Sequence, residues 1–356
     1  MKEEKVYLTL QNGRQFVGYR FGARGDVIGE LVFTTGMTGY IETLTDPSYY
    51  GQIVIQTFPL IGNYGVTPDM QSDRPWVSAY IVREKCDDPS NFRCEGTLEK
   101  YLEDNGIVGI YGLDTRELTK IVRETGVMNA AISSKPVKDF SKIEKYTIVN
   151  AVKTVTCKEP VYYGDPNGIK VVVWDFGAKY NIAQELVKRG CHCIVVPATY
   201  TAEQILALNP QGLMLSNGPG DPSENVEIIE NIKKLIGKLP IFGICLGHQL
   251  LSLAMGGKTK KMKYGHRGGN QPVKNVNTGR VYISSQNHGY EVISSSLPVG
   301  TLSYVNANDG TCEGVDYPDY NAFTVQFHPE ARGGPRDASF LFDKFLKNIK
   351  EGKYNA

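Results

Sequence analysis

Long hydrophobic runs are missing from this sequence, and their absence argues against a membrane protein. No stretch comes near the roughly 20 consecutive apolar residues that a helix needs to cross a bilayer. The first five residues, Met1 to Lys5, lack the apolar core of a signal peptide. We therefore expect no association with a membrane.

Cysteine is scarce and follows no pairing pattern. The chain has seven cysteines, an odd number, and no Cys-x-x-Cys pair. Disulfide scaffolds and zinc ribbons both depend on cysteines at regular, paired spacings. We expect a reducing, cytoplasmic location, with no disulfide framework and no metal site.

An excess of one charge is also absent. The chain has 39 Lys and Arg residues against 38 Asp and Glu residues, which gives a net charge of +1. This balance provides no electrostatic attraction for nucleic acid or for an anionic surface. The phosphate-binding pattern Gly-x-x-x-x-Gly-Lys-Ser/Thr is missing too, so we expect no nucleotide site of that kind.

What the sequence does contain is two regions with different patterns, as expected for 356 residues. Residues 1–150 hold short strand-like runs, beginning with a hairpin around Asn12-Gly13, and two expected helices near 96–105 and 115–125. Residues 151–167 carry turn-forming clusters and form the expected linker. Strands and helices then alternate over residues 168–356. The predicted fold class is α/β, with a mostly parallel C-terminal sheet and a β-rich α+β N-terminal domain.

The most informative stretch is Gly-Ile-Cys-Leu-Gly-His-Gln at 243–249, which links an apolar run to an expected helix. A cysteine between glycines at a strand-to-helix turn is typical of a nucleophile elbow. The turn lifts the sulfur to the carboxyl edge of the sheet, and the helix N-terminus favours a negative sulfur. Cys245 is therefore the candidate nucleophile.

A cysteine nucleophile needs a base, and five histidines compete for that role. His192 lies in an expected strand and His248 on the elbow helix, so both are interpreted as packed residues, while His266 and His288 fall in loop-like stretches that could line a site. His328 follows an expected strand and is followed by Pro329 and Glu330. In extended backbone the His and Glu side chains point to the same side. The predicted triad is Cys245, His328 and Glu330.

Two further stretches have both a structural and a functional interpretation. Ser-Asn-Gly-Pro-Gly-Asp-Pro at 216–222 is either a plain turn or a source of backbone donors for an oxyanion, together with the amide of Leu246. The polar stretch 35–50 is either a surface loop or a loop that presents hydroxyl and backbone groups to a neighbouring site.

These motifs resemble those of a known family. The elbow at 243–249, the loop at 216–222 and the His-Pro-Glu sequence are similar to those of class I (triad-type) glutamine amidotransferase domains. Residues 35–54, Asn-Tyr-Gly at 63–65 and Gly-Leu-Asp-Thr-Arg at 112–116 resemble the N-terminal domain of the small subunit of carbamoyl phosphate synthetase. So do Gly-His-Arg-Gly-Gly-Asn-Gln-Pro-Val at 265–273 and Ser-Gln-Asn-His-Gly-Tyr at 285–290.

The resemblance implies a set of contacts with glutamine. They would be made by Ser48 from the first domain, and from the second by Gly218, Gly220, Leu246, Gln249, Asn287, Gly289 and Tyr290. Gly218 and Gly220 would also help form the oxyanion hole. Two residues depart from the family pattern: Tyr290 stands where phenylalanine is expected, and Arg267 where a second histidine is common.

The resemblance also implies a function and a partner. The chain would hydrolyse glutamine and deliver ammonia to a large synthetase subunit, in a heterodimer or a higher oligomer. That subunit would hold ATP and Mg²⁺ and make carbamoyl phosphate for arginine or pyrimidine biosynthesis, so we expect no cofactor in this chain. The chain ends soon after its last expected helix, as in the free-standing bacterial-type subunit. The alternatives are a stand-alone γ-glutamyl hydrolase and a non-catalytic docking subunit.

Overall fold

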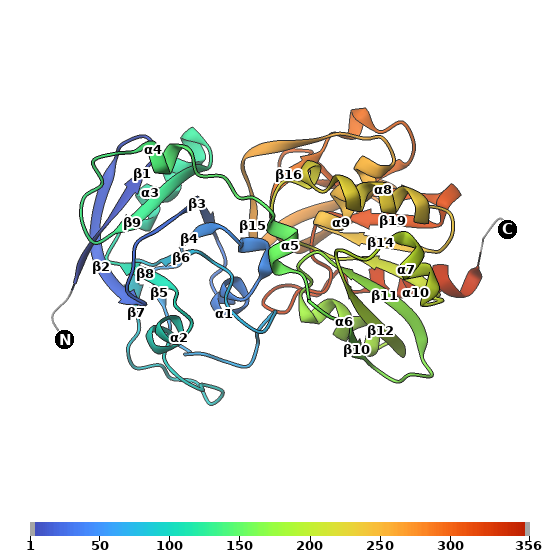
Figure 1. Cartoon of the computed structure of the whole chain (residues 1–356), viewed down its shortest axis with the longest axis horizontal. Helices are drawn as coiled ribbons and strands as arrows, with labels where there is room; N and C mark the ends of the chain where they lie inside the picture. Colours follow the sequence, from blue (N-terminus) through green and yellow to red (C-terminus); the bar gives the residue numbers. More distant parts are fainter. Residues whose placement is uncertain (1–3, 353–356) are drawn as a thin grey trace. The chain divides into compact units, whose positions relative to one another are not determined.

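The computed structural model describes residues 4–352 of the chain. Contacts between residues group these into two compact units, and the boundary falls between Val149 and Asn150 (Figure 1). Among the described residues, no helix combines the length and the apolar character needed to cross a bilayer. The two units are described separately below.

The first unit is built on a closed β-barrel (Figure 1). Its strand order is β1-β2-β8-β6-β4-β3-β9, with parallel and antiparallel pairs. The strands are β1 (Lys5–Leu10), β2 (Gln15–Gly22), β3 (Val27–Thr34), β4 (Gln52–Gln56), β6 (Ala79–Ile81), β8 (Val108–Tyr111) and β9 (Met128–Ser133). Around it lie the pair β5 (Leu60–Ile61) and β7 (Glu84–Lys85) and helices α1 (Tyr40–Leu44), α2 (Leu98–Asp104), α3 (Thr115–Thr125) and α4 (Ser141–Glu144).

The first hairpin explains how the sequence starts this barrel. Side chains of a strand alternate between its two faces, and Val6, Leu8 and Leu10 of β1 are all fully buried in the barrel interior. Gly13 turns the chain with a φ of 85°, a conformation that glycine adopts without strain. The hairpin and the helices near 96–105 and 115–125 are confirmed.

The interpretation of residues 35–50 as a surface loop is wrong for their second half. This part contains α1 and a 3₁₀ turn, η1 (Pro47–Tyr49). Thr45, Asp46 and Ser48 are buried, and their polar groups are used within the segment or close to it. The Asp46 carboxylate accepts from the amide of Ser48 at 2.9 Å, and the Thr45 hydroxyl donates to the carbonyl of Ile41 at 2.8 Å. Internal hydrogen bonding therefore allows this polar segment to be buried.

The second unit is an α/β domain around one ten-stranded sheet. The sheet order is β10-β12-β11-β13-β14-β19-β18-β17-β15-β16, and the five strands from β12 to β19 are parallel. The bounds are β10 (Val161–Tyr163), β11 (Ile169–Asp175), β12 (Cys191–Pro197), β13 (Gly212–Leu215), β14 (Ile241–Ile244), β15 (Thr259–Asn275), β16 (Val281–Val292), β17 (Thr301–Asn306), β18 (Cys312–Tyr317) and β19 (Ala322–Val325). This confirms the α/β class and adds an antiparallel half.

Helices cover both faces of the parallel strands. On one face lie α7 (Ala202–Ala207), α8 (Val226–Leu235) and α9 (Leu246–Ala254), packed with Val172 and Trp174 of β11. On the other lie α6 (Tyr180–Val187) and α10 (Phe340–Glu351), packed with Val171 and Val173. Neighbouring residues of one buried strand thus serve two cores, which explains why the strand is apolar throughout. Three short 3₁₀ turns complete the unit: η2 (Pro222–Glu224), η3 (Ser294–Ser296) and η4 (Pro318–Tyr320).

Two stretches of the second unit differ from expectation. Residues 151–167, expected as a linker, contain helix α5 (Ala151–Val155) and edge strand β10, and they group with the second unit. His266 and His288 lie on the long strands β15 and β16, and not in loops. The β15 sequence is rich in lysine and glycine, and its pairing with β16 shifts register twice, so it gives no regular alternation.

The stacked pair of aromatic rings in the core of the second unit should contribute strongly to its stability. Phe242 is fully buried and stacks on Phe323 with ring centroids 4.3 Å apart. Removing this ring leaves a cavity, so Phe242→Ala should lower the free energy of unfolding by about 3–5 kcal/mol in urea denaturation. Phe92, whose side chain is 95% exposed, is the matched control. Phe92→Ala should change stability by less than about 0.5 kcal/mol, and equal losses in both variants would contradict this packing.

Candidate active site

Cys245 lies at a sharp turn between strand β14 and helix α9. Its φ of 53° is in the left-handed region, which costs a non-glycine residue about 1–3 kcal/mol and is typical of functional sites. The two glycines near Cys245 are needed because there is no room for a side chain at either position. A Cβ atom at Gly243 would lie 2.8 Å from the carbonyl oxygen of Gly247, and one at Gly247 would lie 2.3 Å from that of Leu215. The elbow expected from the sequence is therefore present.

The base and its orienting group come from the strand beside the elbow. Strands β14 and β19 are parallel neighbours, and the amide of Cys245 donates to the carbonyl of Val325 at 2.9 Å. Strand β19 ends at Val325. His328 follows three residues later and lies at the same edge of the sheet as Cys245. The amide of His328 donates to Ser285 at 2.9 Å, which fixes its backbone.

His328 and Glu330 form a buried pair. The ring Nδ1 lies 2.7 Å from Glu330 Oε1, and both side chains are almost fully buried. The Nδ1 proton is therefore held in the hydrogen bond to Glu330, and Nε2 is the ring nitrogen that exchanges a proton during the reaction. Among residues 4–352, Nε2 has no partner that meets full hydrogen-bond geometry, but the Cys245 thiol is near enough to affect the ring.

Opposing effects set the charge of His328. Burial and the nearby ammonium of Lys179 lower its pKa, but Glu330 and the Cys245 thiol outweigh them and raise the pKa to about 9. Burial raises the pKa of Glu330, but His328 and Lys179 together bring it below its ordinary value. At neutral pH the pair is therefore an imidazolium beside a carboxylate.

Lys179 is a site residue that reasoning from the sequence missed. Its Nζ lies 3.3 Å from His328 Nδ1 and 3.7 Å from Glu330 Oε1, and its side chain is only 11% exposed. It precedes helix α6 at the carboxyl end of β11, the same sheet edge that carries Cys245. That position at a strand end was the available signal.

The loop 216–222 is held against the elbow. The amide of Gly247 donates to the carbonyl of Ser216 at 3.0 Å, and the Ser216 hydroxyl accepts from the amide of Phe176 at 2.9 Å. A Cβ atom at Gly218 would lie 2.2 Å from the Phe176 carbonyl and 2.8 Å from a methyl of Leu246, and Gly220 has a φ of 88°. Backbone groups of the loop therefore lie beside the start of α9.

Strand β16 passes the sulfur on another side. The Cys245 thiol lies 3.7 Å from the carbonyl oxygen of Asn287, to which it donates. Gln249, on the first turn of α9, donates through Nε2 to the carbonyl of Tyr290 and to Gln326 Oε1, both at 2.9 Å. Strand β16 therefore brings the carbonyls of Asn287 and Tyr290 to the elbow, and Gly289 lies between these two residues in the same strand.

The remaining predicted residues lie elsewhere or serve packing. Ser48 belongs to the first unit, where its amide bonds to Asp46, so its contact with glutamine stays a prediction. His192 stacks on Tyr162 of the edge strand β10. His248 is buried inside α9 with Nδ1 2.7 Å from the Thr324 hydroxyl, and burial lowers its pKa to about 3. His328 is thus the histidine paired with an acid beside the thiol.

An elbow cysteine with a His–Glu pair just after the adjacent parallel strand is the arrangement of triad-type amidotransferases. Residues 172–348 match the family model "Glutamine amidotransferase class-I", and residues 8–132 match "Carbamoyl-phosphate synthase small chain, CPSase domain". Together the two matches cover both units.

Curated relatives extend this finding across the chain. The carbamoyl phosphate synthase small chain of Syntrophotalea carbinolica is 51% identical, over 98% of this chain and 99% of the relative. Those of Clostridium perfringens and Fusobacterium nucleatum are 51% and 52% identical over 96% of this chain, and cover 99% and 97% of the relatives. The chain belongs to the family of carbamoyl phosphate synthase small chains.

The charge balance at His328 can be measured directly. In a titration followed by nitrogen NMR, the His328 pKa should be about 9. Glu330→Gln should lower it below 6.5, because burial and Lys179 then outweigh the remaining effect of the Cys245 thiol. Lys179→Met, the matched control, should raise it further. A wild-type value at or below 6.5 would contradict the pair.

The same shift predicts a pH-dependent stability. The folded protein holds the His328 proton more tightly than the unfolded chain, whose histidines titrate near 6.5. This contribution is therefore full below pH 6.5 and is lost as the pH rises through about 9.

Proposed function

We propose that this chain is the glutaminase subunit of a glutamine-hydrolysing carbamoyl phosphate synthase. Family membership over nearly the whole chain gives the enzyme, and the class I amidotransferase domain gives the reaction, release of ammonia from glutamine. The observation that carries the proposal is the strained elbow at Cys245 beside the buried His328–Glu330 pair.

The reaction uses the triad in two steps. The Cys245 thiolate, with the His328 imidazolium beside it, attacks the side-chain amide carbon of glutamine; a C–S bond forms and the carbonyl oxygen takes the negative charge. His328 gives its proton to the departing nitrogen, the C–N bond breaks and ammonia leaves. His328 then takes a proton from water, the hydroxide oxygen attacks the thioester carbon, and the C–S bond breaks; glutamate leaves, and the Cys245 thiolate and His328 imidazolium are restored. Glu330 orients the ring and stabilises its positive charge throughout.

Backbone amides stabilise the oxyanion in both steps. The amide of Leu246 lies at the first position of α9, where an N–H group has no partner within the helix. Gly218 and Gly220 provide the second donor from the adjoining loop. In comparable sites, loss of one such donor raises the barrier by roughly 3 kcal/mol.

The remaining groups hold the substrate. Gln249, Asn287, Gly289 and Tyr290 contact glutamine from α9 and β16, and Ser48 contacts it from the first unit. The location of Asn287 beside the thiol supports this assignment, and so does the bond from Gln249 to the Tyr290 carbonyl. Lys179 keeps Glu330 ionised, and it makes the Nε2 proton easier to give up because it lowers the His328 pKa.

The ammonia leaves this chain for a partner. A small chain of this family implies a large subunit, and we propose a heterodimer, or a higher oligomer built from it. The large subunit would hold ATP and Mg²⁺ and combine ammonia with bicarbonate for arginine or pyrimidine biosynthesis. This chain would need no cofactor for its own step. A cytoplasmic location stays a prediction.

Removing the nucleophile tests the division of labour. In the complex with the large subunit, Cys245→Ser should lower glutamine-dependent carbamoyl phosphate synthesis by roughly 10,000-fold. Synthesis from added ammonia should stay at the wild-type rate. Cys157→Ser, which changes a half-buried cysteine outside the elbow, should leave both activities intact. A docking subunit without catalysis would predict no loss in Cys245→Ser, and loss of both activities would contradict separate sites.

The partner's influence is a second test, directed at the stand-alone hydrolase. Uncontrolled release of ammonia would waste glutamine, so the isolated chain should hydrolyse glutamine slowly. Addition of the large subunit should raise the glutaminase rate at least tenfold, as measured by glutamate release. A rate in the isolated chain equal to that of the complex would favour the γ-glutamyl hydrolase.

A further inference from the structure

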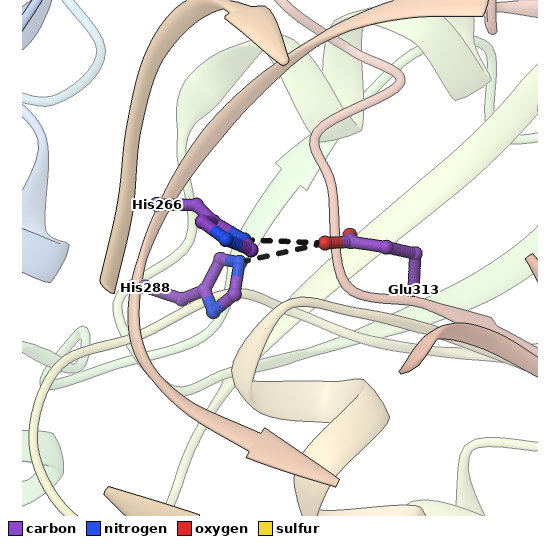
Figure 2. Close-up of side chains that lie close together, drawn as sticks. All are labelled: His266, His288 and Glu313. Carbon is purple, nitrogen blue, oxygen red and sulfur yellow. Dashed lines mark ion pairs between the residues drawn. The ribbon is translucent and has the colours of Figure 1, made fainter. Parts of the chain in front are cut away.

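A second cluster of chemically active side chains lies in the antiparallel half of the second unit. His266 of β15, His288 of β16 and Glu313 of β18 are all buried and converge on one point (Figure 2). Glu313 Oε1 lies 3.4 Å from His266 Nδ1 and 4.0 Å from His288 Nε2. The three residues come from three different strands, and reasoning from the sequence singled out the two histidines but not Glu313.

The hydrogen bonds of His266 direct one nitrogen to the centre of the cluster. Its Nε2 lies 2.9 Å from Asp309 Oδ2, and a carboxylate oxygen can only accept. In the neutral ring, Nε2 therefore carries the proton, and the lone pair of Nδ1 faces Glu313 and the amide Nδ2 of Asn306, which lies 3.4 Å away. A carboxylate that holds the far nitrogen of a histidine in this way is common behind metal ligands.

His288 is arranged in the same way, with the opposite nitrogen. Its Nδ1 lies 2.8 Å from the carbonyl oxygen of Tyr290, which fixes the proton there and leaves the lone pair on Nε2. That nitrogen lies 3.0 Å from Gln286 Oε1.

The side-chain amide of Gln286 is oriented by its own hydrogen bonds, so its oxygen Oε1 faces His288. Two acceptors, Gln286 Oε1 and the lone pair of His288 Nε2, therefore lie next to each other. Gln286 Nε2 donates to the Ser284 hydroxyl at 3.3 Å, and that hydroxyl donates to the Gln271 carbonyl at 2.9 Å. A cation or a second proton on His288 would relieve the repulsion.

Glu313 supplies the negative charge. Its side chain is fully buried, and Asn306 Nδ2 lies 3.4 Å from Oε1 as a donor. Among the described residues, Glu313 Oε2 has no hydrogen-bond partner. A buried carboxylate is costly unless a positive charge or several donors compensate it.

We propose that His266 Nδ1, His288 Nε2 and the Glu313 carboxylate bind a divalent transition metal ion of the Zn²⁺ type. Two imidazoles and one carboxylate are a known three-ligand set for zinc, with bond lengths of about 2.0–2.2 Å and a fourth position open. Ligand atoms at those lengths lie roughly 3.3–3.6 Å apart in a tetrahedron. The His266–Glu313 distance of 3.4 Å fits and the His288–Glu313 distance of 4.0 Å is longer; the three ligand atoms lie within 4.8 Å of one another and would draw together around the ion.

The metal ion would join three strands of the antiparallel half. His288 lies between Asn287, whose carbonyl contacts the Cys245 thiol, and Tyr290, whose carbonyl contacts Gln249. An ion at His288 would hold this segment of β16 in place. The site itself does not depend on the proposed glutaminase function.

The alternative is a network that uses protons in place of a metal ion. Burial lowers the pKa of His266, but Glu313 and Asp309 outweigh it and raise the pKa above its ordinary value. Burial raises the pKa of Glu313. A proton shared between these two side chains would neutralise the cluster without a metal ion.

Metal titration of the full chain separates the two possibilities. Cys245→Ser serves as the background, because a thiol beside a histidine can itself bind zinc. The Cys245→Ser protein should bind one equivalent of Co²⁺ and show the visible absorption of a four-coordinate Co²⁺ ion. Added Zn²⁺ should displace the Co²⁺. Zinc should also raise the melting temperature by several degrees, because it binds the folded state.

Substitutions locate the ion. Glu313→Gln, which keeps the side-chain volume, should weaken Co²⁺ binding at least 100-fold. Asp309→Asn, at a half-exposed residue outside the core, should weaken it roughly 10-fold. His192→Asn is the matched control and should bind as tightly as the background. The proposal is overturned if the background protein binds no Co²⁺, if Glu313→Gln binds it equally well, or if His192→Asn loses it.

Discussion

The candidate active site depends on the elbow at Cys245, where a positive φ is held by the pairing of two parallel strands. The bond from the Cys245 amide to Val325 sets the register of β14 against β19. That register decides that His328, three residues later, reaches the sheet edge beside the sulfur. Gly243 and Gly247 make the turn possible because neither position has room for a Cβ atom. The pairing of β14 with β19 therefore determines both the shape of the turn at Cys245 and the position of its base, His328.

Electrostatics then fixes the protonation of the site. His328 is buried and lies near the ammonium of Lys179, and both conditions oppose its positive charge. Glu330, at 2.7 Å, and the Cys245 thiol together outweigh them, so an imidazolium persists where water is largely excluded. Lys179 at the same time lowers the His328 pKa from the value that Glu330 alone would give, which favours transfer of the proton to ammonia. His266 and His288 are also buried and share one carboxylate, Glu313, where the proposed ion would supply the positive charge.

Local patterns predicted most of the parallel half of the second unit and the members of the His328 pair. Apolar runs that alternate with helical patterns identified strands β11 to β14, and a spacing of two residues joined His328 to Glu330. Lys179 was missed because nothing in its local sequence reveals a contact with residues about 150 positions away. Strand β15 was missed because lysines, glycines and two register shifts obscure its alternation. The segment around Ser48 was misjudged because its polar groups bond to one another and so can be buried.

The central claim is that the sulfur of Cys245 becomes covalently bonded to the glutamyl group of the substrate. The most direct measurement is rapid acid quenching during glutamine turnover, followed by peptide mass spectrometry of the seven cysteines. The account predicts the added mass of one glutamyl group on the peptide that contains Cys245, and on no other cysteine. Steady hydrolysis of glutamine with no adduct on Cys245, or with the adduct on a different cysteine, would contradict it.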